Sequence, residues 1–363
     1  MKVDARALAW VRLQVSGVGP RPQADLLRAF GSPEAVIAAT PAQRRKVVGA
    51  AASPLDAGPD ASRLDAALAW LGDDAHGIVA LDDADYPGSL LEIADPPPTL
   101  YWMGRRELLG RPALAIVGSR NATPQGMADA RAFAHALADA GLTIVSGLAL
   151  GIDAAAHRGA LEGEASSIAV TGTGLDRVYP AQNRALAHDL AQRGLVVSEF
   201  APGTPPLPQN FPRRNRIVSG LARGVLVIEA TASSGSLITA RFAAEQGREV
   251  FAVPGSIHSP FSKGCHRLLR EGAKLVETAE DVLSELRLPA RAAPRAAIAA
   301  TNDDELTADE RAVIAALGHA PSSVDALVAR SGLAAEAVAA ALVALELAGR
   351  ASPLPGGLWQ PRA

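Results

Sequence analysis

The 363-residue chain has very little of what several classes of protein require. Its single cysteine, Cys265, excludes an internal disulfide framework and a cysteine-rich zinc site, and it suits a reducing cytoplasm. No apolar run approaches the roughly 18 residues of a membrane span. The first ten residues carry charges at Lys2, Asp4 and Arg6, which is not the pattern of a secretory signal. We therefore expect a cytoplasmic protein with no membrane partner.

The chain also lacks an excess of positive charge, because 35 Lys and Arg against 38 Asp and Glu give a formal net charge of −3. Any site for an anion must therefore be built locally, by the placement of basic residues. The stretch NFPRRNRIVSGLA places Arg213, Arg214 and Arg216 where we predict the start of a helix over residues 213–222. Since a helix N-terminus already carries partial positive charge, three cations there indicate a negative ligand. For Arg213, a solvated position on the exposed helix face is an equal alternative.

Hydrophobic patterning divides the chain into three folded parts and a linker. Residues 1–75 have a helical pattern, in which the Gly-x-Gly turn of VSGVGP separates two helices and Ser32 is an expected N-cap. This is the outline of a helix-hairpin-helix, whose turn can offer N–H groups to a phosphate, or of a helical module that binds no ligand. Residues 76–286 form the central part, residues 287–304 an Ala-, Pro- and Arg-rich linker, and residues 305–363 a small C-terminal domain.

The central part alternates short apolar runs with helical stretches. The runs are ALAIV, LTIVS, SIAVT, LVVSE, VLVIEA, EVFAVP and AKLVE. Uninterrupted apolar strands are buried on both faces, which predicts an α/β fold with a doubly wound, mostly parallel sheet. Thr123 and Pro124 predict the start of the first helix, and Gly141 predicts its end. The Pro-rich stretch ADPPPTLYWMG, residues 94–104, is interpreted as a boundary before this pattern.

The C-terminal domain has the outline of a winged helix. Two capping-box sequences, Thr307-x-x-Glu310 and Ser322-x-x-Asp325, predict helix starts, and LAAEAVAAALVALELAGR predicts a third helix. ASPLPGGLWQP then fits a hairpin. The third helix has no Lys or Arg, and its apolar face fits the domain's own core or a docking surface. The apolar residues at helical spacing are Val338, Leu342 and Leu345.

Ligands of an open parallel sheet bind beyond the carboxyl ends of its strands, and six loops there are rich in Gly, Ser and Thr. Glycine lets backbone N–H groups approach a phosphate, and the helices that follow add their dipoles. We expect Arg120, Arg214, Arg216 and Lys263 to converge at this edge. The other candidate residues of these loops are Gly118, Ser119, Gly147, Gly172, Gly174, Ser234, Gly235 and Ser236.

The sequence gives little support for catalysis, for a cofactor or for a metal. Neither G-x-G-x-x-G nor G-x-x-x-x-G-K-[ST] is present, and one histidine among scattered carboxylates is a poor metal site. The candidate acid–base residues are Asp153, Asp176, Glu199, Glu229 and His157. Structural roles fit them better: Asp153 as a helix N-cap, His157 as a packed or hydrogen-bonded residue, and Glu199 and Glu229 as partners of arginines.

Single-stranded nucleic acid fits the pattern better than a catalytic substrate. A sequence-tolerant binder needs a basic groove, main-chain donors and a few aromatic rings on which bases stack. Four aromatic residues lie in these loops, and each can serve in stacking or simply in packing. They are Phe200, Phe211, Tyr179 and Phe261.

Six motifs follow one another in the central part: IVGSR, SGLALGIDAAAH, GTGLDRVYP, FPRRNRIVSGL, SGSLITA and GREVFAVPG. In this order and spacing they closely resemble the DNA-processing protein A family, also called Smf, over roughly residues 80–286. The resemblance implies an extended Rossmann-like fold that is not an oxidoreductase, with a SAM-like helical domain before it and a winged helix after it. It also implies non-catalytic binding of single-stranded DNA, usually as a homodimer, and loading of the RecA recombinase during natural transformation.

The resemblance assigns DNA contacts to particular positions. Arg120 stands at the arginine of the GSR motif, residues 214–216 lie in the FPxRNR motif, and Lys263-Gly264 match a Lys/Ser-x-Gly loop. The residues implied in the last two motifs are Arg214, Asn215, Arg216, Lys263 and Gly264. The chain departs from the family at Ala181, where some members have a lysine and Arg184 is the nearest basic residue, and at His266, where an asparagine is frequent.

Two other classes of protein stay open. A nucleotide-binding hydrolase can share a Rossmann-like core, but its P-G-G-x-G-T-x-x-E signature is replaced here by SSGSLITA. A winged-helix transcription regulator would need a basic recognition helix, and the sequence shows none.

Overall fold

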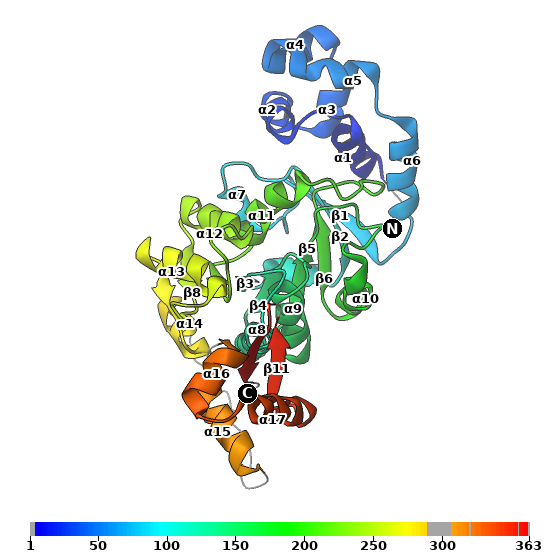
Figure 1. The fold of residues 1–363 in the computed structure, drawn as a ribbon. Helices are drawn as coiled ribbons and strands as arrows, with labels where there is room; N and C mark the ends of the chain where they lie inside the picture. Colours follow the sequence, from blue (N-terminus) through cyan, green and yellow to red (C-terminus); the bar gives the residue numbers. More distant parts are fainter. Residues whose placement is uncertain (1–3, 289–305, 319–320, 355, 362–363) are drawn as a thin grey trace.

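The computed structural model describes residues 4–288, 306–318, 321–354 and 356–361. The predicted linker, residues 287–304, lies outside the described residues from position 289 onward. Figure 1 shows the N-terminal helices beside one end of the central sheet. Their bounds, with η for short 3-10 helices, are α1 (Ala5–Val15), α2 (Pro20–Phe30), α3 (Pro33–Ala38), α4 (Pro41–Val48), η1 (Gly49–Ala52), α5 (Ser53–Ala57) and α6 (Ala61–Trp70).

The N-terminal helices share a hydrophobic core with the sheet. The N-cap predicted at Ser32 is confirmed, because its side chain accepts a hydrogen bond from the Ala35 N–H. Trp10 and Leu13 of α1 are buried in one cluster with Tyr101 of the sheet. The Tyr101 hydroxyl also donates to Gln14 Oε1 at 2.6 Å. The helical part is therefore held against the central part by apolar packing as well as by polar contacts.

The central sheet has nine strands in the order β1-β2-β6-β5-β4-β3-β7-β8-β9. All pairs from β6 to β9 are parallel, which confirms the predicted mostly parallel α/β sheet, and β1 and β2 are antiparallel. The strands are β1 (His76–Ala80), β2 (Thr99–Gly104), β3 (Ala113–Val117), β4 (Thr143–Ser146), β5 (Ser167–Val170), β6 (Leu195–Ser198), β7 (Gly224–Val227), β8 (Glu249–Ala252) and β9 (Lys274–Leu275).

The boundary expected at residues 94–104 is wrong. Strand β2 occupies most of this stretch, and it pairs with β1 on one side and β6 on the other. The prolines come just before the strand, at positions 96–98, so none of them removes a donor from the ladder. The sheet therefore extends across a stretch whose composition is typical of a linker.

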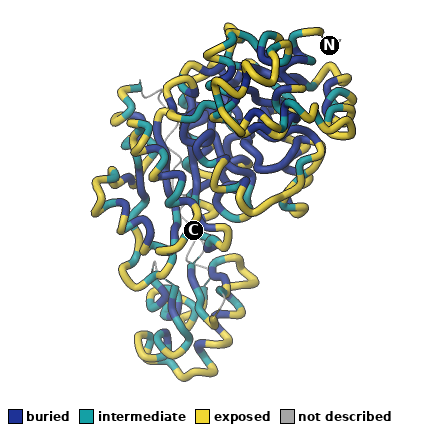
Figure 2. The backbone as a smooth tube through the Cα atoms, turned by 90° about the horizontal axis from the view of Figure 1, so that it is seen from above, coloured by how far each residue is buried: buried dark blue, intermediate teal, exposed yellow. Residues whose placement is uncertain are grey.

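Helices cover both faces of the sheet, as the apolar strands predict. One face holds α8 (Pro124–Asp139), α9 (Ile152–Glu162), α10 (Arg184–Arg193) and α14 (Ala279–Glu285). The other holds α7 (Gly88–Leu91), α11 (Asn210–Gly220), α12 (Ser236–Glu245) and α13 (Lys263–Arg270). Short helices η2 (Arg106–Gly110), η3 (Ala181–Asn183) and η4 (Pro260–Ser262) lie in the connections. Figure 2 shows the buried residues running through the centre, with exposed residues on the outer turns.

The strand order contains a topological switch point between β3 and β7. From β3 the chain runs outward through β4, β5 and β6, and it then returns to the other side of β3 to form β7, β8 and β9. The loops that follow β3 and β7 therefore diverge and leave a crevice between them. Ligands of open α/β sheets bind in such a crevice.

The C-terminal domain is a winged helix, as predicted. It comprises α15 (Ala308–Leu317), β10 (Ser322–Ser323), α16 (Val324–Ser331), α17 (Ala335–Leu347), β11 (Ala351–Leu354) and β12 (Leu358–Pro361). The capping box at Thr307 is confirmed. The capping box predicted at Ser322 is wrong, because Ser322 pairs in β10 and the N-cap is Ser323, whose side chain accepts only from the Ala326 N–H.

The apolar face of α17 forms the core of its own domain. Val338, Leu342 and Leu345 are each at most 1% exposed. Within the described residues, no single helix is long and apolar enough to cross a membrane. Only α16 and α17 taken together, with a bend of 110° between them, pass that test of length and composition.

Candidate nucleic-acid interface

Helix α11 begins three residues before the predicted start. It runs over Asn210–Gly220, so that Pro212 lies in the first turn, where its missing N–H needs no intrahelical partner. Arg213, Arg214 and Arg216 therefore lie in the second turn. The argument that three cations at a helix start demand an anion is wrong, and each arginine has to be judged by what it contacts.

Arg216 is part of a buried network and does not reach the carboxyl edge of the sheet. Its Nη1 and Nη2 donate to the Glu199 carboxylate at 2.8 and 2.9 Å, and its Nε donates to Asp95 at 3.1 Å. Arg213 donates to the same Glu199 carboxylate at 2.8 Å, with 40% of its side chain exposed. The expected convergence of Arg216 with the other basic residues is therefore not found, because two carboxylates hold it on the other side of the helix.

Arg214 is also buried, at 5% exposure, but it has no such partner. Its side chain makes no hydrogen bond or ion pair with any described residue, and its Nε is a buried donor without an acceptor. It passes directly over the backbone of Gly147, where a Cβ atom would lie only 1.7 Å from its Nη1. Gly147 is thus required for close packing against Arg214, rather than to offer an N–H group to a ligand.

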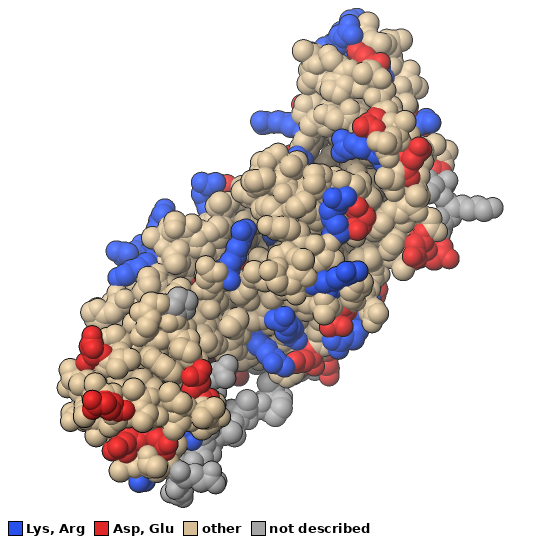
Figure 3. Space-filling model, turned by 45° about the vertical axis from the view of Figure 1, so that its right-hand side comes forward, with Lys and Arg blue, Asp and Glu red and all other residues tan. Residues whose placement is uncertain are grey.

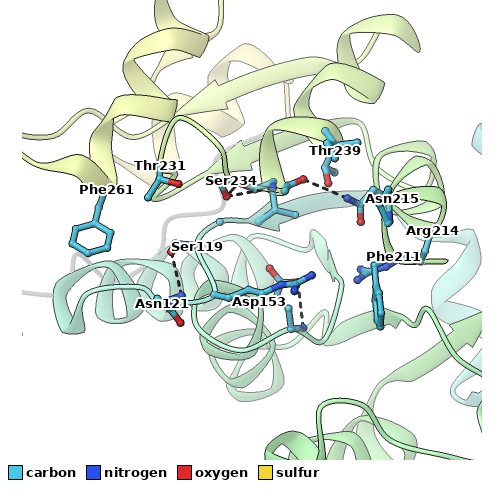
Figure 4. Close-up of a pocket in the computed structure, with 18 residues that line it drawn as sticks. Ser119, Asn121, Asp153, Phe211, Arg214, Asn215, Thr231, Ser234, Thr239 and Phe261 are labelled. Atoms are coloured by element: carbon cyan, nitrogen blue, oxygen red, sulfur yellow. Dashed lines mark hydrogen bonds between the residues drawn. The ribbon is translucent and has the colours of Figure 1, made fainter. Parts of the chain in front are cut away.

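Arg214 lines a cavity of about 410 Å³ at the switch point of the sheet. Segments 118–121 after β3 and 231–236 after β7 form two of its walls, and residues 211–215 of α11 form a third. Figure 4 shows Ser119 on the first wall and Ser234 on the second, with Phe261 at one end of the cavity and Phe211 at the other. The predicted residues that line the cavity are Gly118, Ser119, Arg120, Phe211, Arg214, Asn215, Ser234, Gly235 and Ser236.

The electrostatics of the cavity centre on one buried cation. Burial and the charge of Arg120 lower the pKa of Arg214 to about 10, against the opposing effect of Asp153. Asp153 also lines the cavity, and burial raises the pKa of its carboxyl group. This carboxylate accepts hydrogen bonds from the N–H groups of Gly147 at 3.0 Å and Ala149 at 3.4 Å, so it does not act as the expected N-cap of α9.

Aromatic rings and a second cation complete the rim. The Arg120 guanidinium is exposed and lies 5.9 Å from the centre of the Phe211 ring. Tyr179, 48% exposed, lies 5.3 Å from the same ring. Phe200, in contrast, is buried under Arg213. Tyr179 and Phe211 therefore provide a partly exposed aromatic surface next to two arginines.

The remaining predicted residues lie outside the cavity. Lys263 is exposed at the start of α13 and donates to the Ile257 carbonyl, and Arg184 is exposed at the start of α10. The backbone N–H of Gly264 donates to the Ala230 carbonyl at 2.7 Å and is therefore already used. Gly172 and Gly174 are buried and pack closely, Gly172 against Phe211 and Gly174 against the backbone of Ala201.

The other candidate acid–base residues have structural partners. Glu229 accepts from the backbone N–H and the hydroxyl of Thr123 at 2.9 and 2.6 Å, so its expected pairing with an arginine is wrong. His157 is buried with its Nδ1 2.7 Å from Ser167 Oγ, as expected for a hydrogen-bonded residue. Asp176 accepts from the Gly203 N–H at 2.8 Å. Within the described ranges, no three His, Cys, Asp or Glu side chains are grouped so that they could hold a metal ion.

The structure adds polar residues that the sequence interpretation did not select. Asn121, Thr231 and Thr239 line the cavity with side-chain amide and hydroxyl groups. Asn121 and Thr231 follow β3 and β7, so the rule for switch points would have selected them if the strand order had been known. Thr239 lies one turn inside α12, and its position depends on helix packing that no local pattern indicates.

Comparison with known proteins agrees with this architecture. The family model described as DNA recombination-mediator protein A matches residues 77–287, and that of the DprA winged helix domain matches residues 296–357. Protein Smf of Escherichia coli K12 is 42% identical over 300 residues, which are 81% of this chain and 80% of that protein.

Two solved structures extend the likeness to three dimensions. The X-ray structure of DNA processing protein A from Streptococcus pneumoniae has a TM-score of 0.69 at 38% identity, over 78% of this chain and 99% of that one. A structure of DNA processing protein A from Helicobacter pylori, described for its single-stranded DNA binding mode, has a TM-score of 0.53 at 32% identity, over 58% and 95%. On these matches in sequence and fold, the chain belongs to the DNA recombination-mediator protein A family.

Proposed function

We propose that this protein binds single-stranded DNA at the carboxyl edge of its sheet and assists the loading of RecA onto that DNA, without catalysing a reaction. One observation carries the proposal: Arg214 is a buried cation with no hydrogen bond or ion pair to any described residue, and it lines a cavity. An unpaired buried charge is costly, so an anion that enters the cavity gains a strong interaction. The single-stranded DNA binding mode described for the Helicobacter pylori relative supports a phosphate as that anion.

The shape of the cavity favours a single strand over a duplex. A volume of about 410 Å³ accommodates one nucleotide unit but not a base pair inside a helix. Phe211 and Tyr179 offer aromatic surface to an unstacked base, while Arg120 and Arg214 face its phosphate. We propose that Arg184 and Lys263 contact the strand where it leaves the cavity, whereas Gly264, which is buried and donates its N–H to the Ala230 carbonyl, serves in packing.

A salt series with single-residue variants tests the DNA site. Arg120→Ala should weaken binding similarly for all base sequences, and the slope of log K against log salt should fall by about 0.7 for the lost phosphate contact. Arg158→Ala is the matched control, because Arg158 is an exposed arginine on α9 away from the cavity. If Arg120→Ala binds as tightly as Arg158→Ala at every salt concentration, the assignment of the DNA site is wrong.

The absence of catalysis is proposed because each candidate group already has a structural role. Asp153, the one such group in the cavity, accepts two backbone hydrogen bonds and lies in the field of Arg214. A general base would need in addition a nucleophile or water to act upon. Assays with nucleoside monophosphates, ATP and labelled oligonucleotides should therefore detect no product. Turnover that disappears in Asp153→Asn would favour the nucleotide hydrolase instead.

The finer assignments are proposals with tests of their own. We propose that the protein is a cytoplasmic homodimer, and light scattering of the purified chain would detect the dimer. We also propose that it contacts RecA, which a pull-down with DNA present would detect.

We further propose that residues 1–75, 76–286 and 305–363 are separate domains and that residues 287–304 are a linker. Limited proteolysis should then cut first within residues 287–304. For the regulator alternative, a basic recognition helix is needed, whereas α17 exposes Glu336 and Glu346.

A further inference from the structure

A second and larger cavity lies at the opposite, amino edge of the same sheet. Its volume is about 750 Å³, and it is bordered by residues 84–89, by η2 and by the segment that ends α11. Pro112, Arg223 and Arg248 on its wall directly precede strands β3, β7 and β8, which are neighbours in the sheet. The cavity is therefore built where three parallel strands begin, away from the residues proposed to bind DNA.

Four arginines from three segments meet in this cavity. They are Arg106, Arg111, Arg223 and Arg248. Their convergence follows from strand register, since Gly224 pairs with Glu249 and the preceding residues Arg223 and Arg248 are therefore adjacent. Arg111 stands two residues before β3, the other neighbour of β7. The sheet thus brings together basic residues that lie far apart in sequence.

Carboxylates neutralise only part of this cluster. Arg106 pairs with Asp85 at 2.5 Å, and Arg248 pairs with Glu92 at 2.7 Å. The Nε atoms of both arginines are nevertheless buried without an acceptor. The Glu107 carboxylate, which also lines the cavity, accepts from Arg105 at 2.8 Å.

Neither Arg111 nor Arg223 forms such an ion pair with a described residue, although the charge of Arg111 helps to lower the pKa of Glu107. Both side chains are exposed, and neither makes a hydrogen bond or an ion pair with any described residue. Gathering like charges in this way costs electrostatic energy unless an anion offsets it. Phosphate oxygens match the planar donor pairs of guanidinium groups, and a polyanion can engage several of them at once.

We propose that this amino-edge cavity is a second anion site, which binds the phosphate groups of a polyphosphate chain or of a nucleic-acid backbone. Strand β3, with five residues, separates the two edges by about 17 Å, so one phosphate cannot reach both cavities. The two cavities share no lining residue, so each can be altered by substitution without changing the residues of the other.

The test is a calorimetric titration of the full chain with sodium tripolyphosphate at constant ionic strength. It is carried out in an Arg214→Met background, which removes the buried cation of the carboxyl-edge cavity. Adding R111A/R223A should weaken tripolyphosphate binding at least about tenfold, or ~1.4 kcal/mol. The control pair R12A/R158A removes the same charge from exposed arginines that also lack a side-chain partner in the described chain, and it should bind as the background does.

Two results would overturn the proposal: no tripolyphosphate binding in the Arg214→Met background, or equal weakening by R111A/R223A and R12A/R158A. Competition then distinguishes the sources of phosphate. Displacement of bound tripolyphosphate by oligothymidylate in the Arg214→Met background identifies a nucleic-acid backbone as the ligand. Tripolyphosphate that stays bound at saturating oligothymidylate identifies a small polyphosphate or nucleotide.

Discussion

The two sides of helix α11 hold arginines of one short motif in opposite electrostatic states. Arg216 contacts the carboxylates of Glu199 and Asp95, whereas Arg214 contacts no acceptor among the described residues and lines the switch-point cavity. The two residues are almost equally buried, at 6% and 5% exposure. They point in opposite directions because two positions along an α-helix correspond to a rotation of about 200°.

This difference separates a cation that holds the fold together from one that is available to a ligand. A buried ion pair contributes little net stability over an apolar substitute, but removal of one partner leaves a charge without compensation. Arg216 forms such a buried ion pair, so removal of Glu199 would leave its charge poorly compensated. Arg214 makes no ion pair, and the Asp153 carboxylate offsets its charge only in part, so its burial costs stability in the free protein and favours an incoming anion. Burial alone therefore says little about the role of an arginine, and the presence of its partners decides it.

The largest effect on stability should come from removing Glu199, the main ion-pair partner of Arg216. Glu199→Ala leaves Arg216 buried with only Asp95 as a carboxylate partner, and we expect a loss of about 3 kcal/mol in the free energy of unfolding. Glu162→Ala is the control, because its pair with Arg131 is exposed and should contribute under about 1 kcal/mol. Urea unfolding followed by circular dichroism measures both values. Similar losses in the two variants would mean that the Glu199 network is not structural.

The next effect concerns the unpaired side. Arg214→Met keeps most of the volume of the side chain and removes the charge, so the affinity for single-stranded DNA should fall about 10- to 100-fold, or ~1.4 to 2.7 kcal/mol. The free energy of unfolding should change by less than in Glu199→Ala, because Arg214 makes no ion pair and only the longer-range attraction of Asp153 is lost. Fluorescence anisotropy with labelled oligothymidylate and urea unfolding provide the two measurements. If Arg214→Met lost as much stability as Glu199→Ala, Arg214 would have a structural role like that of Arg216, and the proposed difference between the two arginines would be wrong.

The charge of Arg214 should also affect how the stability of the protein depends on pH, through the buried His157. Burial, aided by the charge of Arg214, lowers the pKa of His157 to about 3 from its ordinary value of 6.5. Ser167 Oγ donates to the Ile144 carbonyl, so His157 Nδ1 must donate to Ser167, which leaves the buried Nε2 without a partner. The folded state therefore binds the proton less readily than the unfolded state.

Stability should accordingly fall as the pH drops below 6.5. The contribution of His157 amounts to about 2 kcal/mol between pH 7 and pH 5. His157→Gln should remove this part of the acid sensitivity, and Arg214→Met should reduce it because a repelling charge is lost. Urea midpoints at pH 7, 6 and 5 measure the effect. Parallel pH dependence in the natural protein and in His157→Gln would show that this histidine protonates easily in the fold.

Deletion of the C-terminal domain should have the smallest effect on DNA binding, because this domain contains neither Arg214 nor Arg216. Figure 3 shows acidic side chains gathered at the lower end of the molecule, where Figure 1 places α15–α17. Deletion of residues 288–363 should leave single-strand affinity within about threefold, or ~0.7 kcal/mol. The same binding assay decides this. Micromolar or tighter binding of duplex DNA by the isolated domain at physiological salt would instead support the regulator alternative.

Local patterns predicted much of the fold but not the boundaries of its elements. The seven apolar runs became the parallel strands, since such runs can be buried only inside a covered sheet. Strand β2 was missed because three prolines precede it and because it pairs antiparallel to both neighbours, of which β6 is distant in sequence. Helix α11 was predicted to start too late because Pro212 was interpreted as preceding the helix, although proline is equally compatible with a first turn.

Half of the candidate site could be predicted for a similar reason. Ser119, Arg120 and Ser234 lie in loops that follow strands, and the rule for carboxyl edges selects such loops without knowledge of the strand order. The roles of Arg216, Gly147 and Gly264 could not be predicted, because each depends on an atom from a distant segment. Those atoms are the Glu199 carboxylate, the Arg214 guanidinium and the Ala230 carbonyl.

The sequence by itself determined the kinds of elements, the class of the sheet and the family, because these depend on local periodicity and on motifs that are continuous in the chain. Only the tertiary structure decided which loops meet, which arginine is neutralised and where a cavity opens. Strand order placed the switch point between β3 and β7, and helix rotation turned Arg214 toward it and Arg216 away. Charge compensation depends on distances between segments far apart in sequence, and those distances exist only in the folded chain.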